Sequence, residues 1–193
     1  MDFFTVPTLS FGVLYCFFVI AHDRRRIVHC NVTRHPTSAW VVQQLREAFP
    51  YDSAPGYLIF DRGTQFNNEV IDTVMSFGIQ PKRSSFRSPW QNGAAERWVG
   101  NCRRDLLDHV IVLNERHLKR LLNEYVHYYH DDRTHLALAK GTPAGREVEE
   151  NTDARRRVVS IPRLGGFPRG LPPMRTHIRA NGKSGALFFN PAR

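Results

Sequence analysis

Three acidic residues are the strongest candidates for chemistry in this chain. Asp2 opens an apolar segment, Asp61 follows another apolar segment, and Glu96 comes 35 residues after Asp61. Carboxylate oxygens are the ligands that hard divalent cations prefer. Each residue also has an ordinary explanation, as a solvated chain end, a turn residue and a surface partner of an arginine, respectively. The residue types alone leave both interpretations open.

The segment that carries Glu96 has the pattern of an amphipathic helix. A serine-rich loop at residues 84–88 leads into it, and Pro89 suits the first turn, where its missing N–H costs little. At about 100° of rotation per residue, Glu96 and Arg103 fall along the edge of the apolar stripe. The stripe consists of Trp98, Val99, Cys102 and Leu106. Glu96 is therefore predicted to face the edge of a sheet.

The remaining pattern predicts an α/β domain with a mixed five-stranded sheet flanked by helices. Strands are expected at residues 2–6, 11–21, 27–33, 57–60 and 79–84, and helices at 38–49, 66–77 and 115–130. The first three strands form an antiparallel meander, and the other two alternate with helices. Periodicity ends near residue 148. We therefore expect a core domain at 1–148 and a basic C-terminal tail at 149–193.

Composition favours a globular protein with a polyanionic partner. Hydrophobic residues make up 41% and charged residues 23% of the 193 residues, and the net charge is +9. Residues 151–193 hold nine of the 27 Lys and Arg but one of the 18 Asp and Glu. Cys16, Cys30 and Cys102 form no close pair, which argues against a zinc finger or a disulfide framework and fits a reducing compartment. The unbroken apolar run at 11–21 is shorter than the roughly 20 residues of a membrane-spanning helix, so no membrane partner is expected.

Several segments together resemble the DDE transposases and integrases, in particular the integrase cores of bacterial insertion sequences related to retroviral integrase. The matching segments are residues 1–6, 60–63, 88–97, 128–130, 133–136 and 157–163. The most specific feature is the 35-residue step to Glu96 within a Pro-x-x-Asn-Gly-x-x-Glu context. The resemblance implies an RNase H-like fold in which Asp2, Asp61 and Glu96 bind two Mg²⁺ or Mn²⁺ ions. It also implies that water frees a 3′-hydroxyl at an element end, and that this hydroxyl then attacks target DNA.

The resemblance further implies roles for polar and basic residues. Asn92 and Gly93 lie in or beside a loop leading to Glu96, and Asn92, Arg97 and Arg103 are candidates for DNA contacts. The tail adds three consecutive candidates for binding DNA: Arg155, Arg156 and Arg157. The expected partners are DNA, as element ends and target, and further copies of the chain, in at least a dimer. The expected location is the bacterial cytoplasm, in association with the nucleoid.

One departure from the family keeps two other functions open. Relatives carry a helix-turn-helix region before the first catalytic aspartate, whereas this chain starts one residue before Asp2. We therefore expect an N-terminally truncated core. The alternatives are a catalytically inactive DNA-binding remnant and an RNase H-like nuclease that only hydrolyses DNA.

Overall fold

A three-stranded antiparallel sheet lies at the centre of the protein. A computed structural model describes residues 1–50, 53–85 and 92–146. Strands β1 (Asp2–Pro7), β2 (Val13–Ile20) and β3 (Ile27–Thr33) follow one another as a meander, with β2 in the middle. Valine, isoleucine and aromatic residues dominate β2, and such side chains suit a pleated, buried surface. The predicted antiparallel meander is confirmed.

A second, smaller sheet continues beyond β1. Strands β4 (Tyr57–Phe60) and β5 (Gln80–Arg83) pair in parallel. Among the described residues the ladders form two sheets rather than one sheet of five strands. The two sheets meet where the Met1 amine donates a hydrogen bond to the Ile59 carbonyl, at 2.7 Å. The five predicted strands are therefore present, but their pairing divides three and two.

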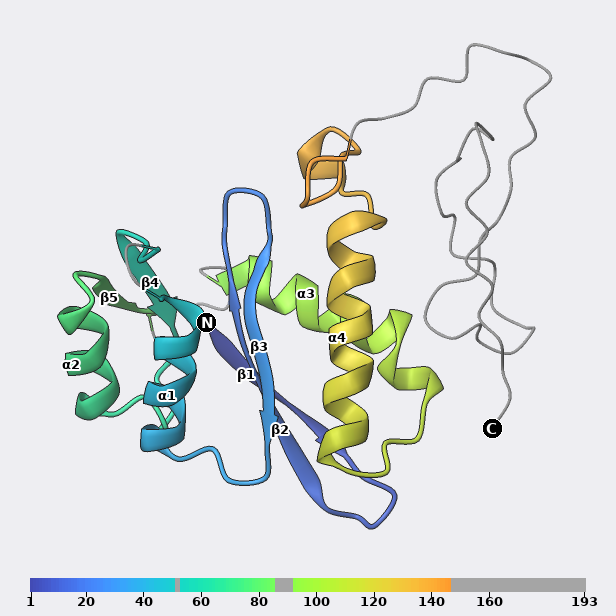
Figure 1. Ribbon diagram of the computed structural model, residues 1–193, viewed down its shortest axis with the longest axis horizontal. Helices are drawn as coiled ribbons and strands as arrows, with labels where there is room; N and C mark the ends of the chain where they lie inside the picture. The colour runs from blue at the N-terminus through green and yellow to red at the C-terminus, as the bar shows by residue number, and fades with distance from the viewer. Residues whose placement is uncertain (51–52, 86–91, 147–193) are drawn as a thin grey trace.

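Four helices flank these strands, together with two short 3-10 helices (Figure 1). Their bounds are α1 (Ser38–Ala48), α2 (Asn68–Ser76), α3 (Gly93–Asp105), η2 (Leu107–His109), α4 (Glu115–Asp131) and η3 (Leu136–Leu138). The helices α1, α2 and α4 each begin after a residue whose side-chain oxygen accepts from a backbone N–H of the first turn, which satisfies an otherwise unpaired donor. Helix α3 begins at Gly93, and the predicted first-turn Pro89 lies outside the described residues. No helix in the described part of the chain is both long and apolar enough to cross a bilayer.

The central sheet separates two hydrophobic cores, because successive side chains of a strand point to opposite faces. Figure 1 shows α3 and α4 on one side of β1–β3, and α1, α2, β4 and β5 on the other. The α3–α4 core includes Phe4, Val6, Leu14, Cys16, Phe18, Ala95, Trp98, Cys102, Leu118, Tyr125 and Tyr129. The α1–α2 core includes Met1, Phe17, Val19, Val41, Leu45, Leu58, Phe60, Phe66, Val70 and Val74.

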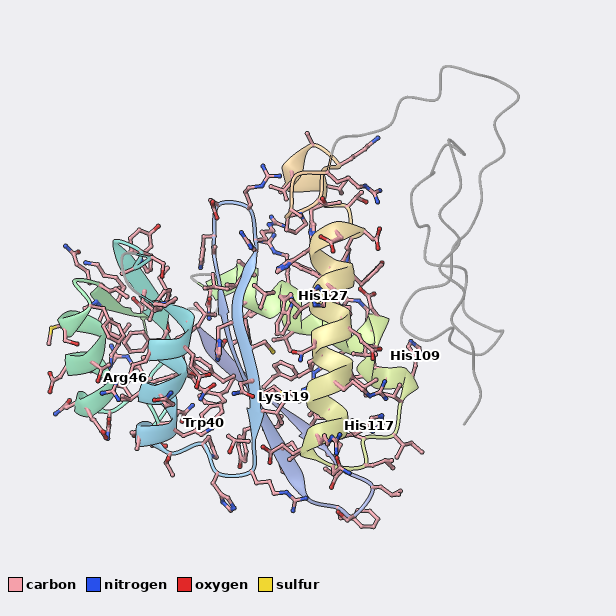
Figure 2. All side chains as sticks on the ribbon, viewed as in Figure 1. Trp40, Arg46, His109, His117, Lys119 and His127 are labelled. Carbon is pink, nitrogen blue, oxygen red and sulfur yellow. The ribbon has the colours of Figure 1, made fainter. Side chains whose placement is uncertain are left out.

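The α1–α2 core reaches the sheet through an aromatic side chain of α1. Trp40 lies between the helix and the sheet (Figure 2), and its ring centroid is 6.3 Å from that of Phe3 and 6.0 Å from that of Phe17. Phe3 also contacts Phe66, at 5.8 Å between centroids. These rings join β1 to the segment between β4 and α2.

Candidate active site

Asp2 lies at the start of β1 on the face that α3 covers. The alternation of the strand puts Asp2, Phe4 and Val6 on the same face. Phe4 and Val6 belong to the α3–α4 core, and the Phe4 ring meets the Trp98 ring of α3 edge-on, with centroids 5.7 Å apart. Two residues before Phe4, the half-buried Asp2 side chain reaches the N-terminal end of the same helix. The packing of α3 on β1 therefore determines which residues contact the Asp2 side chain.

Both carboxylate oxygens of Asp2 accept hydrogen bonds. The Phe3 backbone N–H donates to Oδ1 at 2.7 Å, and the Asn92 side-chain amide donates to Oδ2 at 3.1 Å. The pKa of Asp2 is nevertheless raised, first because burial disfavours the charged carboxylate and then because the negative charges of Asp61 and Glu96 act on it. The hydrogen bond from Phe3 and the charge of the Met1 amine oppose this rise. Three acidic groups that are distant in sequence thus share one electrostatic environment.

Asp61 comes directly after β4, which emerges from the α1–α2 core. Leu58 and Phe60 anchor that strand because both are buried, whereas the Asp61 side chain is exposed. Its Oδ1 accepts from the Gly63 backbone N–H at 2.9 Å, which is a turn that the residue forms with its own loop. The pKa of the Met1 amine is lowered to about 6 by burial, while the charges of Asp2 and Asp61 oppose that shift. Asp61 therefore lies close to the start of β1.

Glu96 lies in the first turn of α3, four residues after Asn92. Residues four apart lie on the same face of a helix, so Glu96 follows Asn92 by one turn on the side that meets Asp2. Its side chain is exposed. Its neighbours on α3, Ala95 and Trp98, are fully buried, whereas the Glu96 side chain lies outside the core.

The donor set suits a hard divalent cation, although the side chains are not gathered around one point. Three carboxylates supply oxygen ligands of the kind that Mg²⁺ and Mn²⁺ prefer. Among the described residues, no group of three or more His, Cys, Asp or Glu side chains is close enough to hold a metal ion. The Asn92 amide donates to Oδ2 of Asp2. The chemistry of the donors fits the metal, and the side chains would have to close around it.

The structure places the predicted DNA-contacting residues in three different settings. Arg97 is exposed, and its Nε donates to the Gly93 carbonyl at 2.9 Å. Arg103 donates from Nη2 to the Thr5 carbonyl at 3.0 Å, so it binds the backbone of β1. Asn92 is buried against Asp2 rather than on an open surface. The three predicted tail contacts lie outside the described residues: Arg155, Arg156 and Arg157.

The contact between Asn92 and Asp2 was not predicted from the sequence. One signal was available, because Asn92 precedes Glu96 by four residues and so shares its helix face. The partner was hidden, since Asp2 and Asn92 are 90 residues apart and only the packing of α3 on β1 brings them together.

A family model matches part of the chain. Residues 77–143 match the integrase core domain. A Caenorhabditis elegans protein named "Uncharacterized protein K02A2.6" is 27% identical over 169 residues, which are 81% of this chain. The chain spans 13% of the length of that relative.

Solved structures of retroviral integrases share the fold. A chain of the simian T-cell lymphotropic virus intasome in complex with PP2A regulatory subunit B56 gamma has a TM-score of 0.54 at 13% identity, over 94% of this chain and 58% of that one. The HTLV-2 integrase catalytic core domain in complex with magnesium, in a trimeric form, has a TM-score of 0.53 at 14% identity, over 74% and 91%. The catalytic core domain of BIV integrase has a TM-score of 0.52 at 15% identity, over 74% and 89%. The fold is thus the RNase H-like α/β fold of these cores.

Proposed function

We propose that this chain, whose residues 77–143 match the integrase core domain, integrates DNA by divalent-metal-dependent strand cleavage and 3′-hydroxyl strand transfer. One observation carries the proposal. Asp61 and Glu96 come from opposite sides of the central sheet, yet the charges of both act on Asp2. Carboxylates that lie near one another repel, so a purely structural role would not favour placing three of them together. A cation site at this edge of the sheet would need the three carboxylates to close around one point.

The proposal assigns the carboxylates of Asp2, Asp61 and Glu96 as ligands of two Mg²⁺ or Mn²⁺ ions. When bound, such ions supply an activated oxygen nucleophile and stabilise the leaving oxygen at phosphorus. The HTLV-2 core with magnesium supports a divalent cation in this fold. Asp2 would hold its orientation through Phe3 and Asn92, and the exposed Asp61 and Glu96 would close toward it. Their exposure leaves the edge open to a long polymer.

Basic residues are proposed to add DNA contacts to those of the acidic edge. Arg97 is adjacent to Glu96 and exposed, which suits a contact to a DNA phosphate near the reacting bond. Residues 149–193 are proposed as a separate basic tail that binds phosphates without sequence preference. Joining two element ends to a target requires two active sites, so at least a dimer is proposed on DNA. The trimeric form of the HTLV-2 core supports self-association in proteins of this fold.

The test is a Mn²⁺ and Mg²⁺ titration by thermal shift. We expect a saturable rise in melting temperature for the parent, and no rise for Asp61→Asn or Glu96→Gln, because each variant removes a ligand charge. At a hundredfold excess over the dissociation constant, binding adds about 2.7 kcal/mol of stability, or roughly 5–10 °C for a chain of this size. Glu124→Gln is the matched control, because Glu124 is an exposed helical glutamate paired with Arg120.

The outcomes separate the proposed function from its alternatives. An equal shift in all four proteins, or none in the parent, would favour the DNA-binding remnant. If the shift depends on Asp61 and Glu96, a second assay with a labelled DNA end decides the reaction. A joined product supports strand transfer, whereas shortened ends alone support a nuclease that only hydrolyses.

A further inference from the structure

The side chain of Asn92 is buried at the junction between β1 and α3. It is 7% exposed, and its Nδ2 donates to Oδ2 of Asp2 at 3.1 Å. We propose that Asn92 is a positioning residue that fixes the Asp2 carboxylate and sets the register of α3 on β1. This inference rests on the proposed function, in which Asp2 and Glu96 bind the same metal centre.

Helix capping does not explain the position of Asn92. It occupies the N-cap of α3, where asparagine ordinarily accepts a hydrogen bond from the first turn. Asn67 and Asn114 do so at the starts of α2 and α4, accepting from Val70 and His117. Asn92 makes no such bond, and its amide instead turns toward Asp2. The side chain of Asn92 therefore binds a candidate metal ligand instead of capping the helix.

The side-chain oxygen of Asn92 indicates that the contact with Asp2 costs folding free energy. Its Oδ1 is buried and has no hydrogen-bond partner among residues 1–50, 53–85 and 92–146. A buried acceptor without a donor destabilises a folded protein, so an apolar side chain would fit a purely structural position better. The hydrogen bond that the Asn92 side chain forms is the one its amide donates to Asp2.

The contact joins the two segments that carry Asp2 and Glu96. The Phe3 N–H bond is local to β1, so it orients Asp2 within its own strand only. The Asn92 bond spans 90 residues and begins one helical turn before Glu96. A shift of α3 along β1 would therefore separate Glu96 from Asp2 and break this hydrogen bond at the same time. Groups that orient a metal ligand typically change metal affinity by about 10–100-fold when they are removed.

Asn92→Ser tests the positioning role directly. Serine is a good N-cap residue, so α3 keeps a normal start, but its hydroxyl is too short to reach Asp2. We expect the Mn²⁺ dissociation constant, measured from the electron paramagnetic resonance signal of free Mn²⁺, to rise about 10–100-fold. Asn101→Ser is the control, because Asn101 lies on the same helix and its Oδ1 accepts from Arg104 instead. Equal affinity of Asn92→Ser and the parent would overturn the inference.

A metal-free measurement separates failure of this inference from failure of the proposed function. In a double-mutant cycle of Asp2→Ala and Asn92→Ser, we expect the loss in melting temperature of the double variant to be smaller than the two single losses together, because both remove one bond. Additive losses would overturn the positioning role whether or not Mn²⁺ binds. A parent that binds no Mn²⁺ but shows coupling would refute the metal function and leave the contact established. Asn92→Gln provides a second variant if Asn92→Ser does not fold.

Discussion

The two faces of the central sheet are stabilised in different ways. The α3–α4 core combines large aromatic side chains with buried polar contacts, and Asp105 accepts from the Tyr125 hydroxyl at 3.1 Å and from Arg133 Nε at 3.0 Å. The α1–α2 core is mainly aliphatic and phenylalanine side chains. Gln44 is a buried polar residue at this core, and its Oε1 accepts from the Asn31 side-chain amide at 2.7 Å and lies 2.9 Å from His29 Nε2. The α3–α4 face therefore includes a half-buried ion pair, that of Arg133 and Asp105, whereas the side chains of Gln44 and Asn31 are uncharged.

This difference matters because the candidate site draws on both faces. Glu96 belongs to α3 on one face, Asp61 follows β4 on the other, and Asp2 lies on the strand between them. The Asp2 carboxylate has partners from β1 and α3, whereas the Oδ1 of Asp61 accepts only from its own turn at Gly63 among the hydrogen bonds described for it. Of the three candidate ligands, Asp2 is therefore held by both its own strand and α3, whereas the exposed Asp61 and Glu96 are held less firmly.

The largest effect is expected when the α3 face is disrupted. Trp98 is fully buried, and its ring centroid lies 4.3 Å from that of Phe18 and 5.7 Å from that of Phe4. Trp98→Ala should lower the free energy of unfolding by about 3–5 kcal/mol, as other buried aromatic truncations do. Urea denaturation measures this loss.

The matching variant on the other face is Leu45→Ala, because Leu45 is fully buried in the α1–α2 core. It should cost about 2–5 kcal/mol, so stability alone does not distinguish the faces. The Mn²⁺ affinity does, at a temperature where both variants are folded. Trp98→Ala should weaken Mn²⁺ binding more than Leu45→Ala does, because α3 carries Glu96. Equal weakening by the two variants would mean that the two faces do not differ in how they support the site.

A smaller effect is expected from the polar contacts of the α3–α4 core. Asp105→Asn removes the charge that binds both Tyr125 and Arg133, and should lower the free energy of unfolding by about 2 kcal/mol. The side chains of Arg133 and Asp105 are 22% and 19% exposed, so solvent screens them only in part. Glu124→Gln breaks an exposed pair on α4 and should change stability by less than about 0.5 kcal/mol. Similar losses in the two variants would mean that the polar contacts of this core add nothing specific.

Local pattern was sufficient to predict the elements but not their assembly. The alternation in β3 and the helical spacing near α4 predicted residues 27–33 and 115–130, close to the observed Ile27–Thr33 and Glu115–Asp131. These signals depend on near neighbours in the chain. The junction between the β4–β5 sheet and the main sheet includes a bond between Met1 and Ile59, and the buried Asn92 forms one with Asp2. Contacts between segments 58 and 90 residues apart leave no periodic signal, so the sequence could supply the candidate ligands but not how they are held.

A further expected effect is a pH dependence that belongs to the α3–α4 face. Burial, together with the charges of Arg133 and Arg25, lowers the pKa of His135 from 6.5 to about 4. Burial also lowers the pKa of His130, whose Nε2 accepts from the Ile27 backbone N–H at 2.9 Å. Both histidines are favoured as neutral side chains in the folded state, whereas the unfolded chain takes up protons near pH 6.5. Their stabilising contribution is therefore complete above that pH and is lost as the pH falls toward 4.

His135→Phe isolates this contribution, because phenylalanine can keep the edge-on contact with Tyr129, now 4.8 Å between centroids, and does not titrate. Between pH 6 and pH 4.5 the parent should lose up to about 1.4 kcal/mol per pH unit more than this variant, the slope that one proton gives. Urea denaturation at several pH values measures the difference. Leu45→Ala, which weakens the opposite face, should keep the slope of the parent. If His135→Phe keeps it as well, the acid sensitivity lies elsewhere, and the directional contacts of the α3–α4 face do not include a neutral His135.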